Sequence, residues 1–273
     1  MDTNFKLLTI RAKEGVYSLL SGNHLSKLYG DGYDFAELRE YQVGDDVRKI
    51  NWNISAKLQK PYIKEVNSNR ELSIVVVSML DGGLYFGEDN KKQHLMTEIA
   101  SMLAYYTQYN NDIFSGINYA QNSIYTTNPT KQIFTIDSYL KDIYNTKTLY
   151  TKLDKQEAIK DLFRRVDKPS LIFVLSDFLD EVDLSTISQK HEIVAIIIRD
   201  EDEQNPTLKG EYNLISPISN DKKKRFINKS SIDRYKLKLK ENDDKLIKHL
   251  SQNSIRYSQI LTNDNILTKL MNL

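Results

Sequence analysis

Three nearly continuous apolar segments constrain the fold of this chain more than any other feature of its sequence. They span residues 72–80, 171–175 and 193–198 and are rich in Val, Ile and Leu. Strands buried on both faces of a sheet have this composition, because helices cover both faces of a parallel sheet. Segments with helical apolar spacing lie between them. The sequence therefore predicts an α/β fold in which helices flank a mostly parallel central sheet.

Further periodic segments extend this pattern to both ends of the chain. Phe5, Leu8, Ala12, Val16 and Leu19 recur at helical spacing and predict a helix that ends near residue 21. A hairpin is predicted with arms at residues 212–215 and 225–227. We expect further helices at residues 91–109, within 137–166, and at 231–251 and 265–273, and further strands at residues 113–119 and 255–261.

The composition changes near residue 66. Residues 30–66 are dense in charged and aromatic side chains and are too polar to form a core alone. We assign residues 1–66 to an amino-terminal extension and residues 67–273 to the α/β domain, which the carboxyl-terminal hairpin and helices complete.

Composition excludes several classes of protein. The chain has no cysteine, so disulfides, thiolate zinc sites, iron–sulfur clusters and cysteine nucleophiles are absent. No segment approaches the roughly 18 consecutive apolar residues of a membrane-spanning helix, and no signal peptide is visible. We therefore expect a cytoplasmic protein without membrane insertion.

The formal net charge of +1 hides an uneven distribution. Residues 1–70 hold 11 basic and 9 acidic side chains, residues 71–200 hold 13 and 18, and residues 201–273 hold 14 and 10. The cluster Lys222-Lys223-Lys224-Arg225 suits either a phosphate backbone or a charged hairpin tip. We favour the hairpin tip and expect no nucleic acid partner, because four residues lack the wide basic face that nucleic acid binding needs.

Most sequence signatures of catalysis are missing. No phosphate-binding glycine loop and no GxSxG turn occur, and His24, His94, His191 and His249 are scattered without metal-ligand spacing. The chain is therefore predicted not to be an enzyme.

Residues 33–65, followed by Phe86-Gly87 and by residues 171–180, form a recognisable signature. They resemble the family called domain of unknown function 58, a group of von Willebrand factor A-like proteins. The matching positions in the first segment are Phe35, Arg39, Glu40, Tyr41, Gly44, Asp45, Arg48, Trp52, Ser55 and Ala56. These residue types suit a charged lid on one sheet edge, anchored by the tryptophan, or else a partner-binding face.

The resemblance also implies a divalent cation site, with an Asp-x-Ser-x-Ser motif after the first strand and an aspartate after a later one. Here the motif positions hold Met79, Asp81 and Gly83, and the later aspartate is Asp177. A methionine thioether is too soft a ligand for Mg²⁺. Two hypotheses remain for Asp81 and Asp177: they terminate strands, or they hold a weakly bound Mg²⁺. Thr127 is the nearest candidate for the threonine ligand.

The resemblance implies a noncatalytic protein-interaction adaptor or scaffold, partnered by a MoxR-type AAA+ ATPase and other von Willebrand factor A-like proteins. The alternatives are a metal-dependent ligand-binding domain or hydrolase that uses Asp81 and Asp177, and nucleic acid binding through the basic carboxyl-terminal third.

Overall fold

A six-stranded sheet forms the centre of the molecule in the computed structural model, which describes residues 3–21, 36–42, 45, 47, 55, 60–66, 71–86 and 90–273. The strand order is β10-β7-β6-β3-β4-β5. All neighbouring pairs are parallel except β4 and β5, which are antiparallel. The six strands are β3 (Ser73–Leu80), β4 (Ile113–Ala120), β5 (Ser123–Thr126), β6 (Leu171–Ser176), β7 (Glu192–Arg199) and β10 (Arg256–Leu261).

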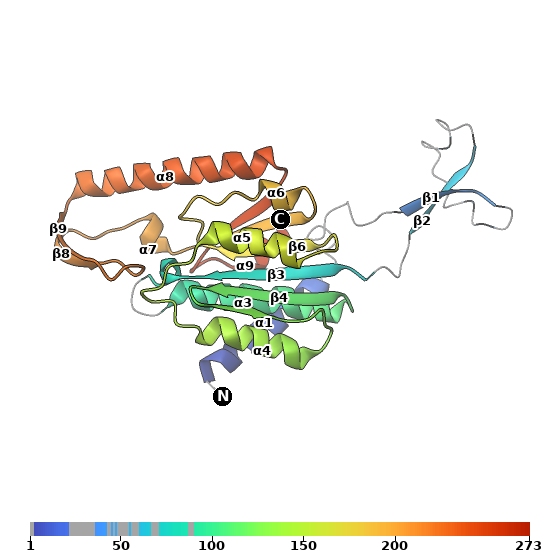
Figure 1. The fold of residues 1–273 in the computed structure, drawn as a ribbon, viewed down its shortest axis with the longest axis horizontal. Coiled ribbons are helices and arrows are strands. Elements are labelled where there is room, and N and C mark those ends of the chain that lie inside the picture. The colour runs from blue at the N-terminus through green and yellow to red at the C-terminus, as the bar shows by residue number, and fades with distance from the viewer. Residues whose placement is uncertain are drawn as a thin grey trace.

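Helices cover both faces of this sheet (Figure 1). One face carries α1 (Thr3–Ser21), α3 (Lys91–Tyr109), α4 (Ile133–Asn145) and α9 (Ile266–Met271). The other face carries α5 (Lys155–Arg165), α6 (Ser185–Ser188) and the carboxyl-terminal half of α8 (Lys229–Gln252). The predicted α/β class, with a mostly parallel sheet between helices, is confirmed.

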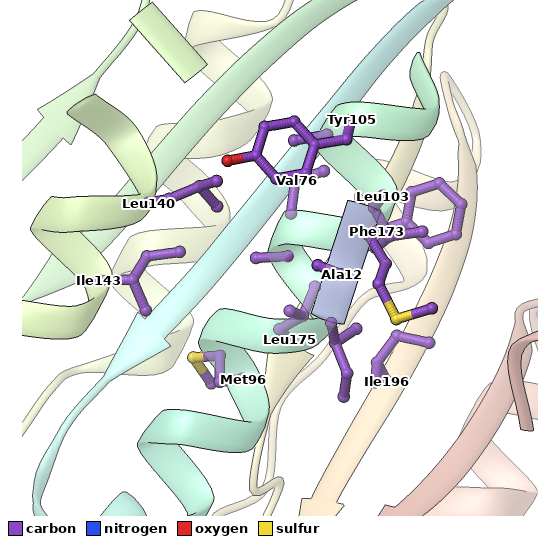
Figure 2. Close-up of a cluster of buried hydrophobic side chains, with 14 of the residues drawn as sticks. Ala12, Val76, Met96, Leu103, Tyr105, Leu140, Ile143, Phe173, Leu175 and Ile196 are labelled. Carbon is purple, nitrogen blue, oxygen red and sulfur yellow. The ribbon is translucent and has the colours of Figure 1, made fainter. Parts of the chain in front are cut away.

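Side chains of β3 alternate between two buried clusters because successive residues of a strand point to opposite faces. Ile74, Val76 and Leu80 enter the first cluster, and Val75 and Val77 enter the second. Figure 2 shows the first cluster, in which Val76, Phe173 and Leu175 from the sheet meet side chains of α1, α3 and α4. Burial on both faces explains why the strand segments are apolar throughout.

The helix predicted from Phe5 to Leu19 is α1, and it belongs to the core of the sheet. Its residues Phe5, Ala12 and Val16 are buried, and the helix packs against α3. The amino-terminal 66 residues are thus divided, because α1 lies on the sheet whereas β1 (Ala36–Glu40) and β2 (Tyr62–Val66) form a separate antiparallel pair.

This β1–β2 pair lies beyond the amino-terminal end of β3 and apart from the six-stranded sheet (Figure 1). The described strands of the signature segment therefore lie away from the sheet edge, and Trp52, the proposed anchor of a lid, lies outside the described residues. Within the ranges that the structure describes, no helix is long and apolar enough to cross a membrane.

The remaining elements lie at the carboxyl-terminal ends of the parallel strands. They are the 3₁₀ turn η3 (Gly82–Leu84), α7 (Glu201–Gln204) and the antiparallel hairpin of β8 (Gly210–Ile215) and β9 (Lys222–Ile227). The sequence predicted the hairpin but placed Lys222-Lys223-Lys224-Arg225 at its tip. That placement is wrong, because these residues begin β9 and the turn comprises residues 216–221.

Candidate functional site

Two buried aspartates follow the two central strands, between which the order of strand addition reverses. Asp81 follows β3 and Asp177 follows β6, and these strands are neighbours at the centre of the sheet. The chain leaves β3 toward β4 on one side and later builds β6 and β7 on the other. Crevices at such a switch point, outside the carboxyl ends of the strands, are where open α/β sheets bind ligands.

The ammonium of Lys155 lies between the two aspartates. Its Nζ is 2.6 Å from Asp177 Oδ1, 3.3 Å from Asp81 Oδ2 and 3.5 Å from Asp180 Oδ2. The side chains of Lys155, Asp81 and Asp177 are each at most 3% exposed. The site therefore contains its own cation. We call these three buried residues the ammonium triad.

Because a single ammonium serves two carboxylates, the two aspartates titrate differently. Burial alone would raise the pKa of Asp177, but attraction to Lys155, Lys92 and Arg199 holds this pKa below its ordinary value. Burial raises the pKa of Asp81, and the attraction of Lys155 is too weak to reverse this. Burial disfavours the Lys155 ammonium, yet its attraction to Asp177 and Asp81 leaves the pKa of Lys155 raised. The shortest contact, Lys155 to Asp177, is thus a charged pair.

Two further buried ion pairs surround the ammonium triad. Lys92 of α3 lies 3.1 Å from Glu203 Oε2 of α7, and both side chains are buried. The guanidinium of Arg199, at the end of β7, pairs with Asp243 of α8 at 2.7 Å. It also donates a hydrogen bond to the backbone carbonyl of Asp177. These pairs connect the helices around the sheet end to the same polar centre.

Local sequence explains how the side chains of the ammonium triad come to lie at the carboxyl-terminal edge of the sheet. Asp81 caps η3, because its Oδ1 accepts a hydrogen bond from Gly83 N at 2.9 Å. A side chain at Gly83 would collide with Asp177 Oδ2, so only glycine leaves the carboxylate in place. Asp154 caps α5 and sets Lys155 as its first residue.

The ammonium triad does not suit a divalent cation. Lys155 Nζ already contacts the carboxylates that would bind the metal, and the aspartate position of the motif holds Met79, which is buried in β3. Like charges at such distances repel, so an incoming cation would have to displace the ammonium. Among the described residues, no group of three or more His, Cys, Asp or Glu side chains could hold a metal ion.

Thr127 is not part of this site. Its backbone N–H donates to Gly116 O, and its Oγ1 accepts from Gly116 N at 2.8 Å. Gly116 lies halfway along β4, so the prediction for Thr127 is wrong: the antiparallel β5 carries this residue back from the carboxyl-terminal edge. Thr151 lies closer, because its carbonyl accepts a hydrogen bond from Gly82 N.

A groove of about 550 Å³ lies beside the ammonium triad. Its walls come from η3, the β8–β9 turn and α8. Apolar and aromatic side chains dominate the lining, and Lys238, Glu241 and Lys245 of α8 are charged residues in it. The apolar and aromatic lining residues are Tyr85, Phe86, Leu179, Pro217, Ile218, Tyr235 and Leu239.

The signature residues of the amino-terminal segment lie elsewhere, where they are described. Glu40 pairs with Lys60 at 3.0 Å, and Tyr41 N donates to Pro61 O. Asp45 Oδ2 accepts from Gln42 N, and Ser55 Oγ accepts from Tyr62 N at 2.8 Å. These contacts lie at the ends of β1 and β2 and in the described residues next to them. Arg39 lies in β1, and Phe35, Gly44, Arg48, Trp52 and Ala56 lie outside the described residues.

Sequence reasoning found Asp81 and Asp177 but missed the lysines. Lys155 and Lys92 both stand in the first turn of a helix, where the macrodipole disfavours a positive charge. A lysine at such a position that is also buried needs a nearby carboxylate. The sequence shows the position of these lysines at the helix starts, but only the structure shows that they are buried.

Comparison with known proteins assigns the family. A family model described as a protein of unknown function, DUF58, matches residues 37–243. The chain belongs to the DUF58 family. The resemblance deduced from the sequence is confirmed, and the match covers β1, β2 and the ammonium triad together.

Relatives of this DUF58 chain include uncharacterised proteins of Mycobacterium tuberculosis and Mycobacterium bovis. Each is 25% identical over 206 residues, which cover 71% of this chain. The chain spans 64% of the length of these relatives.

Solved structures that resemble the DUF58 chain have low sequence identity. They include the conserved hypothetical protein BatB from Bacteroides thetaiotaomicron (9% identity, TM-score 0.41), which covers 74% of this chain and 96% of its own. An aerotolerance-related membrane protein from Bacteroides fragilis (10% identity, TM-score 0.43) has the same coverage. The VWA domain of SpRpn10 (11% identity, TM-score 0.37) covers 74% of this chain and 94% of its own.

Proposed function

We propose that this DUF58 chain is a noncatalytic protein-interaction adaptor or scaffold that works with a MoxR-type AAA+ ATPase in a cytoplasmic, chaperone-like assembly. The ammonium triad is the observation that carries this proposal. Because Lys155 Nζ contacts both Asp81 and Asp177, a metal ion would have to displace this ammonium from the two carboxylates. A recognition module needs rigid walls rather than reactive groups.

The groove beside the ammonium triad is the proposed seat for the partner. Aromatic and aliphatic side chains form its walls, and such pockets accept the apolar anchors that carry most of the energy of an interface. Lys238 and Lys245 line it near the solvent and suit a segment that carries an acidic residue beside its apolar anchor. The ion pairs of Lys92 and Arg199 fix the elements around it and so preorganise the groove.

Binding of the purified MoxR-type ATPase from the same cell tests this proposal. Ile218→Asp places a charge in the apolar lining, and we expect it to weaken the complex by about 30-fold, since a hot-spot change costs about 2 kcal/mol. Phe134→Asp is the matched control, because Phe134 is 76% exposed on α4. Isothermal titration calorimetry with ATP and with ADP measures both variants. Failure of the ATPase to bind in either nucleotide state would contradict the proposal.

Isothermal titration calorimetry also tests the alternative function, a metal-dependent ligand-binding domain or hydrolase. Titration of Mg²⁺ and of Mn²⁺ should give no submillimolar binding to the native chain. Binding that is present in the native chain and lost in Asp177→Ala would favour the metal-dependent function instead.

A further inference from the structure

One segment at the carboxyl-terminal edge of the sheet has no core of its own. No residue from Gln204 to Lys238 is buried, although this range includes β8, β9 and the first ten residues of α8. An isolated two-stranded hairpin is marginally stable in water. Its turn is held to the body by Tyr150 N, which donates a hydrogen bond to Pro217 O at 2.6 Å. We call residues 207–238 the basic arm.

The basic arm concentrates positive charge that the rest of the chain lacks. It holds nine Lys or Arg side chains and three Asp or Glu side chains, whereas the remainder of the chain holds 29 basic and 34 acidic side chains. A nearly neutral protein therefore presents one strongly cationic element. Such an element attracts an anionic surface.

Large apolar side chains are exposed among these charges. Phe226 is 69% exposed and Leu237 is 59% exposed. Soluble surfaces commonly carry single apolar side chains, but here six lie within residues 207–238. The exposed apolar and aromatic residues of the basic arm are Leu208, Leu214, Ile215, Phe226, Tyr235 and Leu237.

The strand register places part of this set on one outer face. Residues directly opposite in an antiparallel pair point to the same side of the sheet. Glu211 is opposite Phe226, Asn213 is opposite Lys224, and Ile215 is opposite Lys222. All six of these residues are exposed. Glu211 is paired with Lys224 at 2.9 Å, so the face combines apolar groups with a net positive charge.

We propose that the basic arm binds the surface of an anionic lipid bilayer, with Phe226 and Ile215 inserted between headgroups and the surrounding lysines in contact with lipid phosphates. Basic side chains near apolar groups are the usual composition of peripheral membrane-binding elements. Lysine stems lie along the apolar region while their ammonium groups stay among the headgroups.

The residue types favour lipid over nucleic acid. Seven of the nine basic side chains in the arm are lysines, which are point charges and lack the planar fork with which arginine binds phosphates and bases bidentately. Four of the six exposed apolar side chains are aliphatic and offer no ring on which a base could stack. This interaction needs no spanning helix and goes beyond the adaptor function.

Co-sedimentation of the full chain with lipid vesicles tests the proposal. We expect binding to vesicles of phosphatidylcholine mixed with phosphatidylglycerol, little binding to phosphatidylcholine alone, and a decrease as salt is raised. The variant Lys222→Gln/Lys223→Gln/Lys224→Gln should lose about 100-fold in affinity, since each basic residue near an anionic membrane contributes about fivefold. Phe226→Ser should lose about tenfold with no change in charge.

The matched control is Lys147→Gln/Lys152→Gln/Lys168→Gln, which removes the same charge from exposed lysines outside the arm. It should retain binding within about twofold if the position of the charge decides affinity. All variants alter exposed residues, so circular dichroism should show unchanged folding. Equal losses in the two triple variants, or binding to a DNA oligonucleotide or to polyglutamate with none to anionic vesicles, would overturn the proposal.

Discussion

Lysines occur in this protein in two opposite environments. Lys155 lies 3% exposed between two aspartates at the end of the sheet, whereas Lys223 lies exposed on β9 of the basic arm. Burial of a charge costs several kcal/mol and is offset only by close partners. Exposed charges contribute little to stability and remain available to another molecule. The comparison shows that the same side chain supports the fold at one site and offers a binding surface at another.

Of the substitutions that compare the buried with the exposed lysines, replacement of Lys155 should lower the free energy of unfolding most. Lys155→Met leaves Asp81 and Asp177 buried without a counter-ion, and we expect a loss of about 3–5 kcal/mol in the free energy of unfolding. Lys223→Met, on the exposed hairpin, should change the same quantity by less than about 0.5 kcal/mol. Urea denaturation of both variants measures the difference. Similar losses of unfolding free energy in the two variants would show that the buried and the exposed lysine do not differ in their contribution to stability.

A triple variant separates lost charge pairing from lost packing. Lys155→Met with Asp81→Asn and Asp177→Asn removes all three charges, and neutral replacement of a buried ion pair is often tolerated. We expect it to recover most of the stability that Lys155→Met loses. No recovery would mean that the lysine stem, rather than its ammonium, stabilises the site.

The second prediction concerns the space around the ammonium triad. Gly83→Ala would place a methyl group against Asp177 Oδ2 and 2.9 Å from Asp81 Oδ1, so the carboxylates must move away from Lys155. We expect destabilisation of about 1–3 kcal/mol by thermal unfolding. Gly15→Ala is the matched control, since its methyl group would meet the flexible end of Met102 and alanine favours the helix α1. It should be neutral or stabilising.

The main elements of the fold were predictable because their patterns are local. Each strand buried on both faces is a continuous apolar segment, and α1, α3 and α8 have regular apolar spacing. The strands β1, β2 and β5 were missed. β1 and β2 are mixed in polarity, and all four residues of β5 are at least partly exposed, so no apolar pattern marks these strands.

The candidate site was predictable only in part. Parallel strands end at one edge, so the sequence placed Asp81 and Asp177 at the same edge of the sheet, and the pairing of β3 with β6 brings them together. Nothing local indicated that Lys155, from a helix 74 residues after Asp81, would place its ammonium between them. The same limitation explains the wrong prediction for Thr127. Its distance from the site depends on the direction of β5, which runs antiparallel to β4 and carries the chain back from the carboxyl-terminal edge.

The smallest predicted effect concerns pH and distinguishes the two aspartates of the ammonium triad. The pKa of Asp81 is raised above its ordinary value of 3.8, so the folded state takes up this proton before the unfolded chain does as pH falls. Its contribution therefore favours the folded state as pH falls through this raised pKa, and is lost as pH rises through it. The pKa of Asp177 is lowered, so its contribution is present above 3.8 and is lost below that value as its carboxylate takes up a proton.

Asp81→Asn should remove the first contribution and keep the second. In urea denaturation between about pH 7 and about pH 3, Asp81→Asn should gain less stability on acidification than the native chain, by about 1 kcal/mol or less. It should keep the gains from Glu98 and Asp112, since burial also raises the pKa of each of these carboxyls. Asp183→Asn is the control, because it also replaces one carboxylate by an amide and Asp183 does not contact Asp81. Hydrogen bonds from Ser185 lower the pKa of Asp183, so its loss should not reduce a gain on acidification. If Asp183→Asn reduced the gain by the same amount, the difference would not come from Asp81. An equal gain in Asp81→Asn and in the native chain would show that folding does not raise the pKa of Asp81.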